Sequence, residues 1–180
     1  MDMRADAFAG LAAIATSIPS LVAESGTGQT RITIGKVDVR PNFAHTIAGD
    51  AEFTVVLRDT DERVMRMVTE RMIATIVEVA AANGLTHTVE TRSWLPPVAL
   101  DAKLVELLGK TAASLAIPAQ VMPSGAGHDA QTMQSLCPSA LIFVPSRGGV
   151  SHAPEEWTDW PDIEKGANLM LAALVELAAG

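Results

Sequence analysis

Two adjacent prolines, Pro96 and Pro97, stand near the middle of a chain of 180 residues. Proline lacks a backbone N–H and fixes φ, so a pair of prolines cannot continue a helix or a central strand. The pair predicts a hinge that divides the chain into two parts, residues 1–93 and 94–180. A chain of this length is compatible with one domain or with two small ones, and the hinge favours two.

Hydrophobic periodicity in the first part predicts helices packed on strands. Apolar residues recur at helical spacing in two segments and alternate in three others. The expected elements are a helix over 5–18 that Pro19 ends, strands over 31–39 and 51–57, a helix over 61–82 and a strand over 85–93. A phase slip at Gly35 and Lys36 indicates a bulge in the first strand. The pattern is typical of an α+β sandwich with one open sheet face or edge.

The second part offers fewer elements. Helical spacing predicts a helix over 102–115, a short helix reaching Met133 and a last helix that begins near Pro161. Residues 139–145 form an unbroken apolar run, which is typical of a strand buried on both faces. Two helices and one or two strands form a layer too thin to enclose its own apolar surface. We therefore expect this part to need further polypeptide.

Composition excludes several classes of partner. The formal charge of −8 argues against a nucleic acid or an anionic membrane surface, because both would repel the chain at long range. Continuous apolar runs fall far short of the ~18 residues that cross a bilayer, and the amino terminus lacks a secretory pattern. We expect a cytoplasmic protein. The single cysteine, Cys137, lies beside the apolar run and is predicted to be a buried, inert thiol.

Two glycine-rich loops flank the apolar run, and each carries a histidine. His128 follows the sequence SGAG, in which Gly127 lets a backbone amide approach a ligand closely because glycine has no Cβ. His152 lies just beyond the carboxyl end of the expected strand, where open α/β sheets place their ligands. A strand between two such loops predicts a site.

These segments carry a resemblance to a known family. The sequences SGAGHDAQ and GVSHAPEE occur in order around IFVPS, and GKVDVRPN, AEFTVVLRDTD and MDMRADAFAG precede them. Together they resemble the carboxyl-terminal half of N-carbamoyl-L-amino-acid hydrolases and allantoate amidohydrolases, which are di-zinc enzymes. The resemblance implies that residues 1–93 form a lid and dimerisation domain with a mostly antiparallel sheet and two helices. Residues 94–180 would be the last α/β segment of the zinc catalytic domain.

The same resemblance implies a role for His152. Hydrolysis of a carbamoyl C–N bond needs an activated water and a Lewis acid on the carbonyl oxygen, and two metal ions can supply both. In the family the histidine of the SHxPxE sequence binds one of the two ions, usually zinc, with manganese, cobalt or nickel as alternatives. The other ligands and the catalytic base lie in the first half of those enzymes and are not found in this sequence. No catalytic residue is therefore assigned here, and Glu155 and Glu156 are expected to form a solvated acidic turn.

The resemblance also places the substrate anchor. Arg58 occupies the position of an arginine that holds the substrate carboxylate, which a guanidinium can do with two parallel hydrogen bonds. His45 occupies the position of a family asparagine that binds substrate. Both positions lie on the smaller domain and reach over the active site of the partner subunit of a homodimer. Gly127 and His128 are expected to line the same pocket, whose ligand is a small ureido or amide substrate with a carboxylate.

Plainer interpretations of these residues stay open. Arg58 could be a strand-end cation that pairs with Asp59 or Asp61. His152 could be a loop residue held by local hydrogen bonds, and His128 could fasten its own loop instead of touching substrate.

Two hypotheses follow for the whole chain. Its first methionine matches an internal position of the family, so we expect a fragment that lacks the family histidine preceding that position. The first hypothesis is a part of a metal-dependent hydrolase of N-carbamoyl amino acids or related ureido acids. The alternative is a non-catalytic dimerising module that has lost the metal-binding half.

Overall fold

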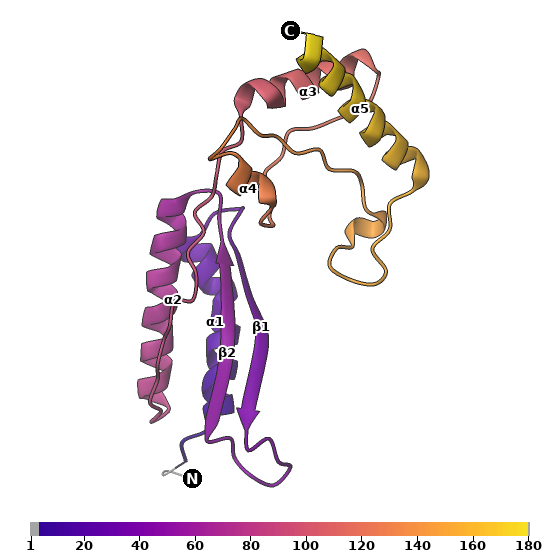
Figure 1. Cartoon of the computed structure of the whole chain (residues 1–180). Coiled ribbons are helices and arrows are strands. Elements are labelled where there is room, and N and C mark those ends of the chain that lie inside the picture. Colours follow the sequence, from indigo (N-terminus) through magenta and orange to yellow (C-terminus); the bar gives the residue numbers. More distant parts are fainter. Residues whose placement is uncertain (1–3, 180) are drawn as a thin grey trace. The chain divides into compact units, whose positions relative to one another are not determined.

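The computed structural model describes residues 4–179 and has an α+β fold, as predicted (Figure 1). The chain forms two compact units, Met1–Pro97 and Val98–Gly180, which are described separately below. The boundary between the units falls at the paired prolines. The lid and catalytic roles of the two units stay predictions.

An antiparallel hairpin forms the sheet of the first unit. Strand β1 (Arg31–Arg40) pairs with strand β2 (Asp50–Arg58), from Arg31 opposite Arg58 at one end to Arg40 opposite Asp50 at the other. The register shifts between Ile34 and Lys36, which confirms the predicted bulge. The loop of residues 41–49 therefore closes one end of the hairpin, while Arg58 lies at the other.

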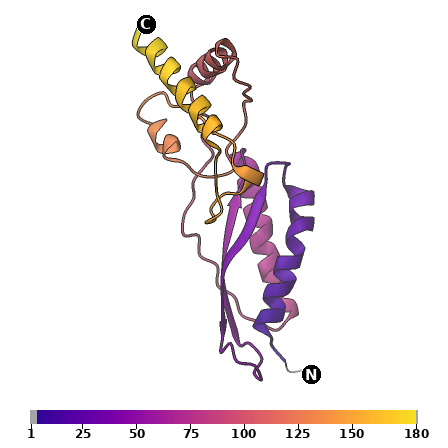
Figure 2. The same ribbon diagram turned by 90° about the vertical axis from the view of Figure 1, so that its right-hand side faces the viewer.

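Two helices cover one face of this hairpin (Figure 2). They are α1 (Ala7–Ser25) and α2 (Glu62–Ala82). The core between helices and sheet consists of buried and partly buried apolar side chains: Ile14, Leu21, Val68 and Met72 at its centre, with Ile32, Phe53, Val55 and Leu57 from the strands. Val56, whose side chain points to the other face as strand alternation requires, is 44% exposed. The sheet thus keeps the open face that the sequence predicts.

Helix α1 differs from its prediction. Pro19 lies inside the helix and does not end it. The turn beyond Pro19 carries Leu21, which is buried in the core, so apolar burial offsets the backbone hydrogen bond that proline cannot donate. Among the residues that the structure describes, α1 is also the one helix long and apolar enough, by length and composition, to cross a membrane. Its apolar residues Leu11, Ile14 and Leu21 are buried in the first unit.

Helix α2 matches its prediction at both ends. Asp61 precedes it and accepts a hydrogen bond from the backbone N–H of Arg63, as an N-cap residue does. At the other end, Gly84 has φ 64°, a left-handed conformation that glycine adopts without strain. The strand predicted over 85–93 was wrong, because this segment belongs to neither helix nor strand. Its side chains from Thr86 to Ser93 are all exposed, so neither face is buried and no pairing register is specified.

The second unit contains helices and loops in the region that the structure describes. The elements are α3 (Ala102–Ser114), α4 (Asp129–Met133), a 3₁₀ turn η1 (Arg147–Gly149) and α5 (Trp160–Ala179). Helices α3 and α5 pack together through Ala112, Leu169 and Ala173, and Thr111 Oγ1 donates to Glu176 Oε2 at 3.2 Å. Leu171 and Val175 of α5 are each 61% exposed. This thin layer leaves much apolar surface uncovered, as the sequence predicts.

The buried strand predicted over 139–145 was wrong. The segment is irregular, and Phe143 and Val144 are exposed. A strand is defined by backbone hydrogen bonds to a neighbouring strand, and this unit provides no such neighbour in its described residues. The segment runs close to α5 instead, where a Cβ on Gly166 would lie 2.5 Å from Val144 Cγ1. Cys137, predicted to be buried, is exposed beside this segment.

Candidate functional site

The loop of residues 41–49 carries His45 and is fastened to the start of α1. The backbone N–H of Ala7 donates to the carbonyl of Ala48 at 2.9 Å, and Ala48 is buried. The N–H of Gly49 donates to the carbonyl of Arg40 at 3.0 Å, which closes the base of the loop. Hydrogen bonds at the end of the loop thus determine its position, although most of its side chains are exposed.

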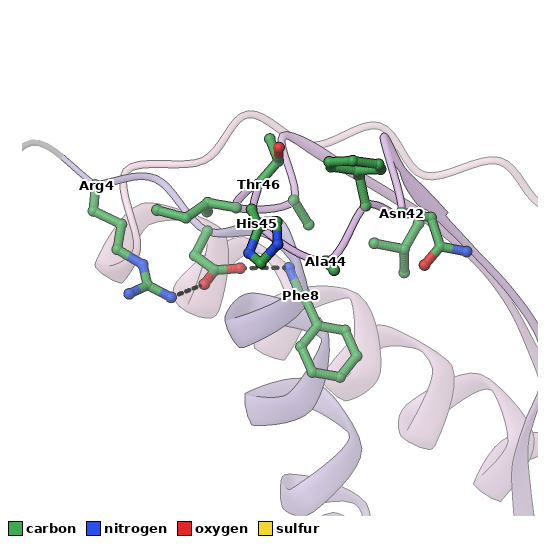
Figure 3. A pocket seen from close by; sticks show the side chains of 11 residues that line it. Arg4, Phe8, Asn42, Ala44, His45 and Thr46 are labelled. Atoms are coloured by element: carbon green, nitrogen blue, oxygen red, sulfur yellow. Dashed lines mark hydrogen bonds and ion pairs between the residues drawn. The ribbon is translucent and has the colours of Figure 1, made fainter.

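A pocket of about 560 Å³ lies between this loop and the amino-terminal segment (Figure 3). Figure 3 shows His45 above the first turn of α1, with Arg4 on one side and Asn42 on the other. The rings of Phe43 and His45 meet edge to face, with 6.2 Å between their centroids. The pocket is lined by Arg4, Asp6, Phe8, Val39, Asn42, Phe43, Ala44, His45, Thr46, Ile47 and Ala48. An imidazole therefore lies beside apolar side chains in one concave surface.

Asp6 organises the wall of this pocket. Its carboxylate accepts from the guanidinium of Arg4 and from the backbone N–H groups of Phe8 and Ala9, at 3.1 and 3.2 Å. The hydrogen bond from Arg4 is the main reason that the pKa of Asp6 lies below its usual value. Sequence reasoning missed Arg4 and Asp6 as pocket residues. An aspartate just before a helical pattern is an N-cap signal, and it was available in the sequence.

Arg58 is the last residue of β2 and is exposed. The next residue, Asp59, is buried and binds the loop before β1: its Oδ2 accepts from Thr27 Oγ1 at 2.6 Å and from Thr30 Oγ1 at 2.5 Å. Its Oδ1 accepts from the backbone N–H of Asp61 at 2.9 Å. The hydrogen bonds of Asp59 therefore fix the backbone that follows Arg58, both to the loop before β1 and to the start of α2.

The structure does not bring Arg58 and His45 together. Eight residue steps separate Arg58 from Asp50, and His45 lies beyond Asp50. At about 3.3 Å per residue, the strand alone spans about 26 Å. A carboxylate is about 2 Å across. The expectation that both side chains hold one carboxylate is therefore wrong for a single copy of the chain.

His152 lies on an exposed loop in the second unit. Its backbone has φ 57°, a left-handed conformation that is uncommon for a residue with a side chain. Its N–H donates to Glu156 Oε2 at 3.1 Å, which closes the loop. Glu156 thus acts as a fastening residue in an acidic turn, while the imidazole of His152 is exposed to solvent.

His128 and Gly127 lie at the start of α4. The His128 ring packs edge to face on Phe143, with 5.2 Å between centroids, and the backbone N–H of His128 donates to Gln131 Oε1 at 3.3 Å. A Cβ on Gly127 would lie 3.3 Å from the same oxygen. These contacts fasten the SGAG loop to the 139–145 segment. A substrate contact by Gly127 or His128 stays a prediction.

With this geometry in place, comparison with known proteins determines the family. The model of a family described as Peptidase family M20/M25/M40 matches residues 3–176. The chain belongs to this family. The predicted resemblance to its amidohydrolase members is also confirmed by individual relatives.

Three curated relatives illustrate the match. An uncharacterized hydrolase of Haemophilus influenzae is 34% identical over 99% of the chain, and an N-carbamoyl-L-amino-acid amidohydrolase of Paenarthrobacter aurescens is 33% identical over 98%. The allantoate amidohydrolase of Bacillus subtilis is 33% identical over 83% of the chain. The chain covers 43%, 43% and 36% of these proteins, respectively. It therefore spans less than half of the length of the relatives it matches.

Solved structures give the same result for the fold. A hydantoinase/carbamoylase family amidase from Burkholderia multivorans aligns with a TM-score of 0.90 and 30% identity, over 98% of this chain and 43% of that one. The structure of AtUAH in complex with glyoxylate aligns with a TM-score of 0.92 and 25% identity, over 100% of this chain and 43% of that one. The M20-family fold accordingly extends through both units.

The described residues do not by themselves fit a complete metal centre. Within residues 4–179 no three His, Cys, Asp or Glu side chains lie close enough together to hold an ion. His152 offers one imidazole, whereas a catalytic zinc takes three protein ligands. A metal site that includes His152 would need ligands from other polypeptide.

Proposed function

We propose that this chain supplies the substrate-binding and carboxyl-terminal parts of a metal-dependent hydrolase that cleaves a C–N bond in N-carbamoyl amino acids or related ureido acids. The observation that carries the proposal is the 33% identity to an N-carbamoyl-L-amino-acid amidohydrolase over 98% of the chain. Since the chain covers 43% of that relative, the remaining metal ligands and the catalytic base belong to polypeptide outside this sequence.

Arg58 is the proposed anchor for the substrate carboxylate. Its guanidinium can form two parallel hydrogen bonds with a carboxylate, and lysine cannot reproduce that geometry. Asp59 and its threonine partners hold the adjacent backbone, which favours a fixed position for the anchor.

His45 is proposed to reach the same substrate from a second copy of the chain. Arg58 and His45 lie at opposite ends of the hairpin, so one copy cannot place both on one small molecule. An antiparallel pair of copies would bring Arg58 of one copy toward His45 of the other, so the homodimer is part of the proposed site.

His152 is proposed to bind one metal ion, with Gly127 and His128 lining the pocket beside it. The exposed imidazole of His152 offers a nitrogen ligand that zinc prefers, and manganese, cobalt and nickel are alternatives. The bound metal would polarise the carbamoyl carbonyl and activate water. A cytoplasmic location is part of the same proposal.

A complementation experiment tests this function. The chain is mixed, with zinc, with the part of the Paenarthrobacter aurescens amidohydrolase that it does not match, and turnover of N-carbamoyl amino acids is measured. Recovery of turnover that Arg58→Lys abolishes would support the proposal. Turnover that is unchanged by Arg58→Lys, or the absence of turnover in a stable, zinc-loaded complex, would contradict it.

A non-catalytic dimerising module is the second candidate. The open sheet face favours it, since Val56 is 44% exposed there and could pack on another copy. This candidate predicts a stable dimer without tightly bound metal in the experiment above.

A further inference from the structure

Resting on the proposed function, we propose that the pocket beside His45 receives the side chain of the substrate and selects N-carbamoyl amino acids with an apolar side chain over allantoate. The two substrate classes are those named for the relatives of this chain. The side chains that would make this selection are those of Phe43 and Ile47.

The pocket combines an apolar wall of Phe8, Phe43 and Ile47 with polar side chains that include Asn42, His45 and Thr46. The His45 imidazole can hydrogen-bond an oxygen of the substrate. Around it, Phe8, Phe43 and Ile47 are 56%, 65% and 48% exposed, although large apolar side chains usually avoid water. A volume of about 560 Å³ is in the range of small-molecule sites. A ligand with an apolar group would cover this wall.

The position of Phe43 relative to His45 determines which part of the substrate it meets. The two ring centroids are 6.2 Å apart and the rings meet edge to face. The α-carbon of an N-carbamoyl amino acid lies two bonds from its carboxylate oxygens. When such an oxygen accepts from His45, the group on the α-carbon can therefore reach the Phe43 ring.

The two charged side chains of the pocket are already engaged by partners within the chain. The guanidinium of Arg4 is already paired with Asp6, whose carboxylate also accepts two backbone hydrogen bonds. Allantoate carries a second ureido group on its α-carbon. Placing that group against Phe43 and Ile47 would remove its hydrogen bonds to water without replacing them. An apolar side chain has no such cost.

Binding to the chain alone provides a test that does not depend on turnover. N-carbamoyl-L-phenylalanine, N-carbamoylglycine and allantoate are titrated into the isotope-labelled chain, and NMR shifts are followed at His45 and Phe43. We expect the phenylalanine derivative to bind about tenfold more tightly than the other two. Phe43→Ser and Ile47→Ser should remove this preference. Val37→Ser, which changes an exposed apolar residue on β1 outside the pocket, should keep it.

Equal affinity for the three ligands, no shift at His45 and Phe43, or a preference that survives Phe43→Ser would overturn the inference. Turnover in the complemented enzyme distinguishes failure of the substrate preference from failure of the proposed function. An active enzyme that hydrolyses allantoate as efficiently as N-carbamoyl-L-phenylalanine would overturn only the substrate preference. If Phe43→Ser abolishes dimerisation and no ligand causes an NMR shift, the apolar wall is a contact between copies. This result would also overturn the proposed substrate preference.

Discussion

Arg58 is the last residue of strand β2 and His45 lies beyond the first, so the length of the β-hairpin separates the two side chains proposed to hold one substrate. This separation gives the proposed enzyme a simple requirement. Each site needs the arginine end of one hairpin and the loop end of another.

Mixed dimers test this requirement. Arg58→Lys and His45→Ala should each abolish turnover of the complemented enzyme, because each removes one half of every site. When the two variants are mixed and exchange subunits at random, half of the dimers should contain one intact site. Turnover should then recover to about a quarter of the wild-type value. Mass spectrometry confirms that the subunits exchange. If turnover does not recover in such a mixture, the shared site is contradicted.

Asp59 should stabilise the first unit in a pH-dependent way. Burial alone would raise the pKa of its carboxyl, but hydrogen bonds from Thr27, Thr30 and the backbone N–H groups of Thr60 and Asp61 lower the pKa below its usual value. The stabilisation is therefore complete above the unfolded-state pKa of about 3.9 and is lost as the pH falls through the lower folded-state value. Asp59→Asn should reduce the free energy of unfolding by about 2 kcal/mol at pH 7.

Urea denaturation at several pH values measures this effect. The difference between wild type and Asp59→Asn should be constant from pH 7 to pH 5 and should shrink below pH 4, near the pKa of about 3.9. Asp38→Asn, which changes an exposed carboxylate on β1, serves as the control and should have a smaller effect. A difference that grows as the pH falls would refute the assignment.

The core of the first unit can be tested with two methionines of α2. Met72 is 3% exposed and packs in the core, whereas Met67 is 49% exposed. Met72→Ala should lower the free energy of unfolding by about 3 kcal/mol, because it removes buried apolar surface and leaves a cavity. Met67→Ala should change it by less than about 0.5 kcal/mol. Similar values for both variants, from thermal or urea unfolding, would argue against the orientation of α2.

His152 can be tested through metal content as well as activity. In the zinc-loaded complemented enzyme, His152→Ala should reduce the zinc bound per complex and lower turnover by more than about tenfold. Its exposed position predicts little change in folding. His87→Ala replaces another exposed histidine and should leave both quantities unchanged. Full zinc content in His152→Ala, measured by elemental analysis, would remove His152 from the proposed metal site.

The sequence by itself was sufficient for most of the local elements and for the family. Helical spacing predicted α2, α3 and α5 because each has one apolar face, and strand alternation predicted the hairpin with its bulge at Gly35. The sequences around His128 and His152 were sufficient to identify the amidohydrolase relatives. These features depend on neighbouring residues along the chain, which a single sequence displays.

Only the tertiary structure decided what depends on distant neighbours. The 139–145 segment has the composition of a strand but lacks a described partner for its backbone hydrogen bonds, and α1 passes Pro19 because Leu21 reaches the core beyond it. Likewise, the sequence separation of thirteen positions from His45 to Arg58 gave no distance until most of the intervening chain proved to be an extended strand. A strand spans more than twice the distance of a helix with the same number of residues. The spacing of His45 and Arg58 in the sequence therefore could not determine the distance between them.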